Sequence, residues 1–172
     1  MESHVIAIVP IKQHSERVPR KNFRDFNKKP LYHWILETLQ DTPEVDEIII
    51  NTDADQVIET ATDKFDVVIS ERPDELQGDF VSMNKIIRYE VEMNEADIFI
   101  QTHCTNPLLQ SATISEALNE FIASEDADSL FTVTKHQKML YDEDLEPINH
   151  DAYDLSRTQD LPPVYENNSN LF

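Results

Sequence analysis

Residues 5–22 read VIAIVPIKQHSERVPRKN, and the interpretation of the whole chain starts from this stretch. Its first part, Val5–Val9, is an apolar run that predicts a buried strand. The segment that follows contains the basic residues Lys12, Arg17, Arg20 and Lys21. A basic loop directly after a first strand suggests a phosphate site, although this loop lacks the glycine on which such loops usually depend. The spacing of these basic residues is equally consistent with a phosphate site and with a solvated charged loop.

The composition limits the ligands that this loop can serve. The chain has 172 residues, which suits one domain with a substantial core, and its formal net charge is −20. An acidic protein of this kind repels nucleic acid and anionic membranes. A local basic loop on such a protein indicates a small anion as ligand, so we expect no nucleic-acid or membrane partner.

The cysteine content and the N-terminal sequence indicate the cellular compartment in which the protein is expected. Cys104 is the single cysteine, so no disulfide forms within the chain. The N-terminal apolar run is too short for a signal peptide, and no stretch approaches the length of a membrane span. We expect a protein of the reducing cytoplasm.

Short apolar runs alternate with segments of helical periodicity over residues 1–135. Strands are expected at Val5–Val9, Glu47–Asn51, Val67–Ser70, Asp97–Thr102 and Ser129–Thr134. Helices are expected at Pro30–Gln40, Asp55–Lys64, Ser82–Met93 and Thr113–Ser124. This alternation predicts an α/β core over 1–135 with an open, doubly wound, mostly parallel sheet. Residues 136–172, rich in proline, asparagine and aspartate, are expected to form an extended segment of the same domain.

Polar segments follow each expected strand. In open parallel sheets, ligands bind beyond the carboxyl ends of the strands. After the basic loop, these segments are NTDAD at 51–55, SERPDELQGD at 70–79, THCTNPLL at 102–109 and Lys135–His136. Because these strand ends meet at one edge of the sheet, we expect an active cleft there.

Several of these segments, in order, resemble the acylneuraminate cytidylyltransferase family, which includes the CMP-sialic acid synthetases. The matching pieces are IVPIKQHSERVPRKNFR, KPLYHWILETL, NTD, ERPDEL with GD and SMNK, THCTNPLL and RTQDLPPVYENNSN. The resemblance covers nearly the whole chain and implies a Rossmann-like nucleotidyltransferase fold. It implies transfer of CMP from CTP to a nonulosonic, sialic-type acid, with release of pyrophosphate and with Mg²⁺ neutralising the phosphates.

The resemblance also implies roles for individual residues of the first loop. Lys21 is expected to contact the α-phosphate, and Arg17 and Lys12 the outer phosphates. Lys21 and Arg17 are the expected catalytic residues. Ser15 and Asn22 are the further nucleotide contacts expected from this loop.

Three later segments supply the other expected contacts. Arg72 matches a position that helps to hold the cytosine, and Ser82 lies in the segment that borders the base. His103, Thr105 and Asn106 match positions near the acceptor sugar. The resemblance thus divides the expected cleft into a phosphate end, a base end and a sugar end.

Some of these polar residues have simpler interpretations. Asp53 and Asp79 each precede an expected helix and are candidates for its cap. His103 is nearly as well explained by a hydrogen bond to the backbone. Cys104 next to His103 is a poor catalytic dyad, because neighbouring side chains on an extended segment point apart. Arg20 is interpreted as solvent-exposed.

The resemblance implies a metal site built on an Asp-x-Asp pair downstream of the LPPVYE-like segment, and the chain ends before that point. Asp142 and Asp144 have the same spacing, but we interpret them as a solvated acidic turn. No His or Cys spacing resembles a zinc site. We therefore expect no metal site within these residues and expect the C-terminal elements of the fold to be missing.

Alternatives to a complete enzyme remain open at this point. The chain is either a truncated cytidylyltransferase or a short relative that binds a nucleotide or a partner without turnover. The resemblance also implies a homodimer through residues 139–165. A glycosyltransferase of similar architecture is a weaker alternative, because THCTNPLL occupies the position where the Asp-x-Asp motif of such an enzyme is expected. Sialic, legionaminic and pseudaminic acids are not distinguished.

Overall fold

The computed structural model describes residues 3–154 and 156–172. By its internal contacts the chain divides into two units. The first runs to Leu130 and includes Asn170–Phe172, and the second is Phe131–Ser169. The division lies close to the change at residue 136 that the sequence suggests. That the two units form one domain stays a prediction.

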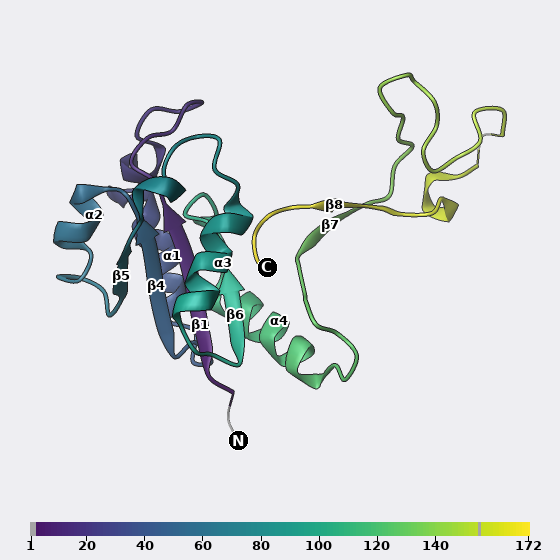
Figure 1. Ribbon diagram of the computed structural model, residues 1–172. Coiled ribbons are helices and arrows are strands. Elements are labelled where there is room, and N and C mark those ends of the chain that lie inside the picture. The colour runs from purple at the N-terminus through teal and green to yellow at the C-terminus, as the bar shows by residue number, and fades with distance from the viewer. Residues whose placement is uncertain (1–2, 155) are drawn as a thin grey trace. The chain divides into compact units, whose positions relative to one another are not determined.

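The first unit contains a four-stranded parallel sheet (Figure 1). Its strands are β1 (Val5–Ile11), β4 (Glu47–Thr52), β5 (Val68–Glu71) and β6 (Ile98–Gln101), in the order β5-β4-β1-β6. Every neighbouring pair is parallel. All seven residues of β1 are buried, as a central apolar run predicts. The expected α/β class with a parallel sheet is confirmed.

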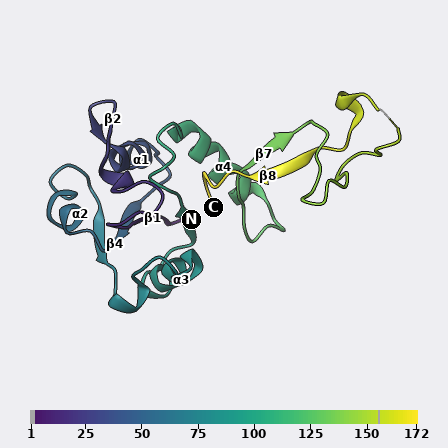
Figure 2. The same ribbon diagram turned by 90° about the horizontal axis from the view of Figure 1, so that it is seen from above.

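Helices cover both faces of this sheet, and Figure 2 shows α1 and α3 on opposite sides of it. The helices are α1 (Leu31–Gln40), α2 (Asp55–Thr60), α3 (Met83–Met93) and α4 (Ser111–Ala123). Successive side chains of a strand point to opposite faces of the sheet, so the side chains of β1 pack alternately against the helices on the two faces. Val5, Ala7, Val9 and Ile11 join one core cluster with α1, α2 and α4. Ile6 and Ile8 join a second, smaller cluster on the side of α3.

The expected strand at Ser129–Thr134 is wrong as a member of this sheet. In the second unit, β7 (Val133–His136) pairs antiparallel with β8 (Val164–Asn167). Only Leu130, Phe131 and Val133 of this segment are apolar, and Phe131 and Val133 are 55% and 40% exposed. Such a pattern is typical of a strand with one face in water rather than of a buried parallel strand.

The residues from 170 to 172 return to the first unit beside β6. The backbone of Phe172 exchanges hydrogen bonds of 2.8 and 3.0 Å with Gln101, and Thr102 forms an antiparallel bridge with Leu171. Leu171 is 3% exposed and belongs to the larger core cluster. A segment that the sequence suggests is extended loop thus completes part of the core.

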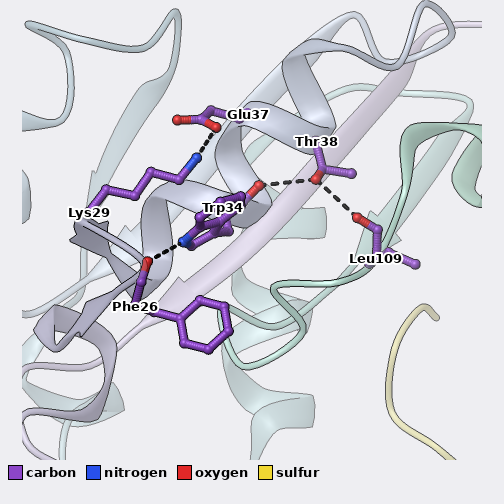
Figure 3. Close-up of polar contacts among 6 residues, drawn as sticks. All are labelled: Phe26, Lys29, Trp34, Glu37, Thr38 and Leu109. Atoms are coloured by element: carbon purple, nitrogen blue, oxygen red, sulfur yellow. Dashed lines mark hydrogen bonds and ion pairs between the residues drawn. The ribbon is translucent and has the colours of Figure 1, made fainter.

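A small hairpin docks on the first turns of α1 (Figure 3). Its strands are β2 (Asp25–Phe26) and β3 (Lys29–Pro30), which follow the short helix η1 (Lys21–Phe23). Asn27 and Lys28 have φ values of 53° and 75°, which suit the two-residue turn of a tight hairpin.

Trp34 of α1 is the main contact of this hairpin. Its indole Nε1 donates to the backbone oxygen of Phe26 at 2.9 Å. The ammonium of Lys29 lies 3.4 Å from the centre of the Trp34 ring and also forms an ion pair with Glu37. One turn further along α1, Thr38 Oγ1 lies 3.0 and 3.1 Å from the backbone oxygens of Trp34 and Leu109 and shares its one proton between them. These contacts fix the chain directly after the basic loop.

The remaining short helices are η2 (Asp74–Leu76) and η3 (Thr158–Asp160). Among the residues that the structure describes, no helix has the length and apolar character needed to cross a bilayer.

Replacing Trp34 with phenylalanine should lower the free energy of unfolding by about 1 kcal/mol, because the indole donor to Phe26 is lost while most of the ring remains. Urea unfolding followed by circular dichroism measures the change. Gln40→Ala, at an exposed position of the same helix, is the matched control and should change stability little. Equal stability of Trp34→Phe and the wild type would contradict the anchoring role of the indole.

Candidate active site

The segments after β1, β4, β5 and β6 meet at one edge, because these four strands are parallel neighbours. The basic loop, NTD, SERPDELQGD and THCTNPLL therefore lie at the same edge of the sheet, as expected, and the active cleft stays a prediction. Lys135 and His136 belong instead to the hairpin of the second unit. There, His136 Nε2 lies 2.7 Å from Glu166 Oε2.

Side chains rather than glycine hold the basic loop in place. Asn22 is buried, and its Nδ2 donates to the backbone oxygen of Lys12 at 3.1 Å. Asp53 Oδ1 accepts the backbone N–H of Gln13 at 2.8 Å. The cap interpretation of Asp53 is wrong, because the residue at the N-cap of α2 is Ala54. Asp53 instead connects the end of β4 to the loop after β1.

Lys12 connects this loop to the segment after β5. Its ammonium forms an ion pair with Asp79, and the two side chains are 38% and 35% exposed. Asp79 does not cap α3, because Ser82 occupies the N-cap position and has no side-chain cap bond. The positive charge of Lys12 is thus balanced by a carboxylate that water reaches.

Lys21 is half-buried and lies near His103, in the segment after β6. Burial lowers the pKa of His103, and the positive charge of Lys21 lowers it further, so the imidazole is neutral at pH 7. Gln101 Nε2 lies 3.2 Å from His103 Nε2, and the ring of Phe172 packs edge-on at 6.3 Å. The partner of His103 is therefore a side-chain amide rather than the backbone. The phosphate loop and the predicted sugar segment converge at this point.

Arg72 is 4% exposed and is held by Asn51. Its Nε donates to Asn51 Oδ1 at 2.6 Å, and its Nη2 donates to the backbone oxygen of Asn51 at 3.0 Å. Burial lowers the pKa of the Arg72 guanidinium, while Asp53 and Glu90 oppose this shift. Its backbone N–H also donates to the oxygen of Thr52 at 2.7 Å. The base-end candidate is thus tied to the end of β4.

The sequence analysis missed Asn51 and Glu90. Asn51 Nδ2 donates to Glu90 Oε1 at 2.5 Å, and both residues are buried. The available signal was the spacing of Ile86 and Glu90, which places a carboxylate on the buried stripe of α3. A carboxylate in such a position needs a specific partner.

The other predicted contacts differ in exposure. Arg17, Ser82 and Thr105 are exposed, Ser15 is half-buried, and Asn106 donates from Nδ2 to the backbone oxygen of Asn170 at 3.4 Å. All five residues follow the carboxyl ends of parallel strands in the sequence, and their roles stay predictions.

Arg20 is more than an exposed cation. It has a φ of 53°, which is uncommon for a residue other than glycine. Its Nη2 donates to Gln56 Oε1 of α2 at 3.2 Å, and its guanidinium lies 5.8 Å from the ring centre of Phe23. Arg20 therefore fastens the outer part of the basic loop to α2.

Within residues 3–154 and 156–172, no group of three or more His, Cys, Asp or Glu side chains is arranged to hold a metal ion. Asp142 Oδ1 accepts the backbone N–H groups of Asp144 and Glu146 at 3.0 and 2.9 Å. This is an acidic turn, as the sequence analysis interprets it. The described residues do not form the magnesium site that the resemblance implies, so no catalytic step is assigned to a metal here.

The chain was compared with known proteins. A model of the cytidylyltransferase family matches residues 6–172. A pseudaminic acid cytidylyltransferase of Campylobacter jejuni is 26% identical over 171 residues, which cover 93% of this chain and 73% of that protein. An N-acylneuraminate cytidylyltransferase of Oncorhynchus mykiss is also 26% identical, over 91% of this chain but only 38% of that protein.

Solved structures support the fold. A CMP:2-keto-3-deoxy-manno-octonic acid synthetase complexed with CTP has a TM-score of 0.61 at 20% identity, over 76% of this chain and 51% of that chain. A 4-diphosphocytidyl-2C-methyl-D-erythritol synthase has a TM-score of 0.68 at 13% identity, over 100% of this chain and 76% of that one. The chain thus spans about half the length of the first of these structures.

Replacing Asp53 with alanine should free the start of the basic loop, because the acceptor for the Gln13 N–H is lost. We expect amide exchange at Gln13 to accelerate roughly tenfold or more, as for a lost charged hydrogen bond. Hydrogen exchange followed by NMR measures it. Asp63→Ala, at an exposed position after α2, is the control. Unchanged exchange at Gln13 would show that the loop is held by other contacts.

Cys104 should be unreactive in the native protein. Burial raises the pKa of its thiol to about 12, so almost no thiolate exists at pH 8. We expect negligible reaction with a disulfide reagent at pH 8 and rapid reaction after unfolding in guanidinium. Because the folded state raises this pKa, deprotonation in the unfolded chain should also lower stability as the pH rises above about 9. A fast native reaction would refute this assignment.

Proposed function

The chain belongs to the cytidylyltransferase family, and on that premise we propose that it transfers CMP from CTP to a nonulosonic, sialic-type acid. The family match confirms the nucleotidyltransferase class that the sequence motifs suggest. The sugar class is inferred from relatives named for pseudaminic and N-acylneuraminic acids.

One observation carries the proposal: β1 and β6 are neighbouring parallel strands, so the basic loop with Lys21 and the segment with His103 leave the sheet side by side. A cation for the α-phosphate and a polar group for the acceptor sugar therefore lie at the same edge of the sheet. A nucleotidyl transfer needs this proximity, because the nucleophile must approach the α-phosphorus in line with the leaving group.

In the proposed reaction, the anomeric hydroxyl of the sugar acid attacks the α-phosphorus of CTP. A new phosphorus–oxygen bond forms, the bond to the bridging α–β oxygen breaks, and pyrophosphate leaves. Lys21 stabilises the negative charge on the α-phosphate, and Arg17 and Lys12 bind the outer phosphates. Lys12 exchanges its carboxylate partner Asp79 for phosphate when CTP binds.

The remaining part of the loop and the base end would position the nucleotide. Ser15 and Asn22 belong to the phosphate loop, and the bond from Asn22 to the Lys12 backbone keeps the two ends of the loop together. Arg72 and Ser82 are proposed for the cytosine. Arg72 retains N–H donors beyond the two that bond to Asn51, because a guanidinium has more donors than these.

The acceptor sugar is assigned to His103, Thr105 and Asn106 after β6. A neutral His103 suits hydrogen bonding to sugar hydroxyl groups. The carboxylate of the sugar acid would be attracted by the same basic loop that binds the triphosphate.

A second candidate is a nucleotide-binding or dimerising protein without turnover. A homodimer through residues 139–165 is also proposed. In its favour, this stretch exposes large apolar side chains: Tyr141, Leu145, Ile148, Tyr153 and Tyr165. We place the protein in the cytoplasm, where its single cysteine would stay reduced.

The decisive experiment mixes the protein with CTP, Mg²⁺ and one sugar acid at a time, and follows pyrophosphate release. We expect release with pseudaminic, legionaminic or N-acetylneuraminic acid, and none with 3-deoxy-manno-octulosonic acid. Lys21→Ala should reduce the rate on the order of a hundredfold or more, as for a lost transition-state contact. Lys28→Ala, in the exposed hairpin turn, is the control.

The other outcomes separate the candidates. Release only with 3-deoxy-manno-octulosonic acid would overturn the sugar class. CTP binding by calorimetry without release would support the second candidate, and the lack of any CTP binding would defeat both.

A further inference from the structure

A buried row of three polar side chains lies beneath the base end of the site. Glu90 of α3, Asn51 at the end of β4 and Arg72 after β5 are 1%, 0% and 4% exposed. Burying a carboxylate and a guanidinium is costly unless their hydrogen bonds are satisfied. The three residues come from three different elements, so the tertiary fold brings them together.

The hydrogen bonds along this row have one possible direction. A carboxylate only accepts, and a guanidinium only donates. The amide of Asn51 therefore donates from Nδ2 to Glu90 Oε1 at 2.5 Å and accepts at Oδ1 from Arg72 Nε at 2.6 Å. A further bond of 3.0 Å, from Arg72 Nη2 to the backbone oxygen of Asn51, fixes the plane of the guanidinium.

Glu90 is itself held from two sides. Ser70 Oγ donates to its Oε1 at 2.6 Å. Asn94 Nδ2 donates to its backbone oxygen at 2.8 Å. Its negative charge favours the charged form of Arg72 and so opposes the effect of burial on that guanidinium. Glu90 thus acts on Arg72 through Asn51 and through charge.

We propose that Glu90 is a positioning residue for CTP binding. Through Asn51 it sets the orientation of the Arg72 guanidinium and supplies its buried counter-charge, so that the free N–H donors of Arg72 face the pyrimidine. This inference rests on the proposed function, in which Arg72 holds the cytosine. It adds to that function two residues that do not themselves touch the nucleotide.

The test uses Glu90→Gln in the full chain, with CTP binding measured by calorimetry. Glutamine keeps the size of the side chain and an acceptor for Asn51, but it removes the charge. We expect the Kd for CTP to rise roughly tenfold, as for a weakened charge-assisted bond. The affinity for inorganic tripolyphosphate, which lacks the base, should stay unchanged.

A double variant provides the rescue. In Asn51→Asp with Glu90→Gln, the new carboxylate accepts from Arg72. The amide nitrogen of the glutamine takes the position of Oε1 and donates to that carboxylate and to Ser70 Oγ, while its oxygen faces Asn94. The row keeps one negative charge and its hydrogen bonds, so we expect CTP affinity within about threefold of the wild type. Thr42→Val removes a buried hydrogen bond at the far end of α1 and should alter only the Tm.

The outcomes separate this inference from the proposed function. If Glu90→Gln binds CTP as the wild type does, or if it weakens CTP and tripolyphosphate equally, Glu90 is not a positioning residue for the base. Failure of the double variant to regain affinity while it keeps a wild-type Tm would also overturn the inference. If Arg72→Ala leaves CTP affinity unchanged, the assignment of Arg72 is at fault, and if the wild type does not bind CTP, the proposed function falls.

Discussion

The arrangement of the site depends on three consecutive residues at the end of β4. Asn51 holds Arg72 and Glu90, the backbone oxygen of Thr52 accepts the N–H of Arg72, and Asp53 accepts the N–H of Gln13. Because β4 lies between β5 and β1, this one segment fixes both of its neighbours. The predicted base end and the predicted phosphate end are therefore held at a constant separation by the sheet.

A second set of tertiary contacts holds the predicted phosphate loop, which contains no glycine, in its shape. Glycine normally allows positive φ and close approach of the backbone to phosphate. Here Arg20 takes the positive φ itself, at 53°, and is held there by Gln56 and Phe23. Tertiary contacts thus replace an intrinsic preference of the backbone, and the loop depends on its neighbours for its shape.

Most of the fold was predictable, because buried parallel strands such as Val5–Ile11 are continuous apolar runs. The strand expected at Ser129–Thr134 was wrong as a member of the parallel sheet, because a short segment with three apolar residues in six does not tell which sheet a strand joins. The edge that carries the site followed from parallel topology, and the family match supports the nucleotidyltransferase class. The links within the site did not follow, because the bond from Asp53 to Gln13 spans 40 residues and the bond from Asn51 to Glu90 spans 39. Local patterns suggest a helix cap for Asp53 and do not reveal such distant partners.

The position of residues 170–172 beside β6 has a consequence for the order of folding. The bond from Thr102 Oγ1 to the backbone oxygen of Asn170 spans 68 residues, fewer than the 93 residues between Val5 and Ile98, which pair in the sheet. On the ribosome, β1, β4, β5 and β6 are all available before Leu171 emerges. Leu171 therefore reaches the core cluster only after the strands that it packs against have been made.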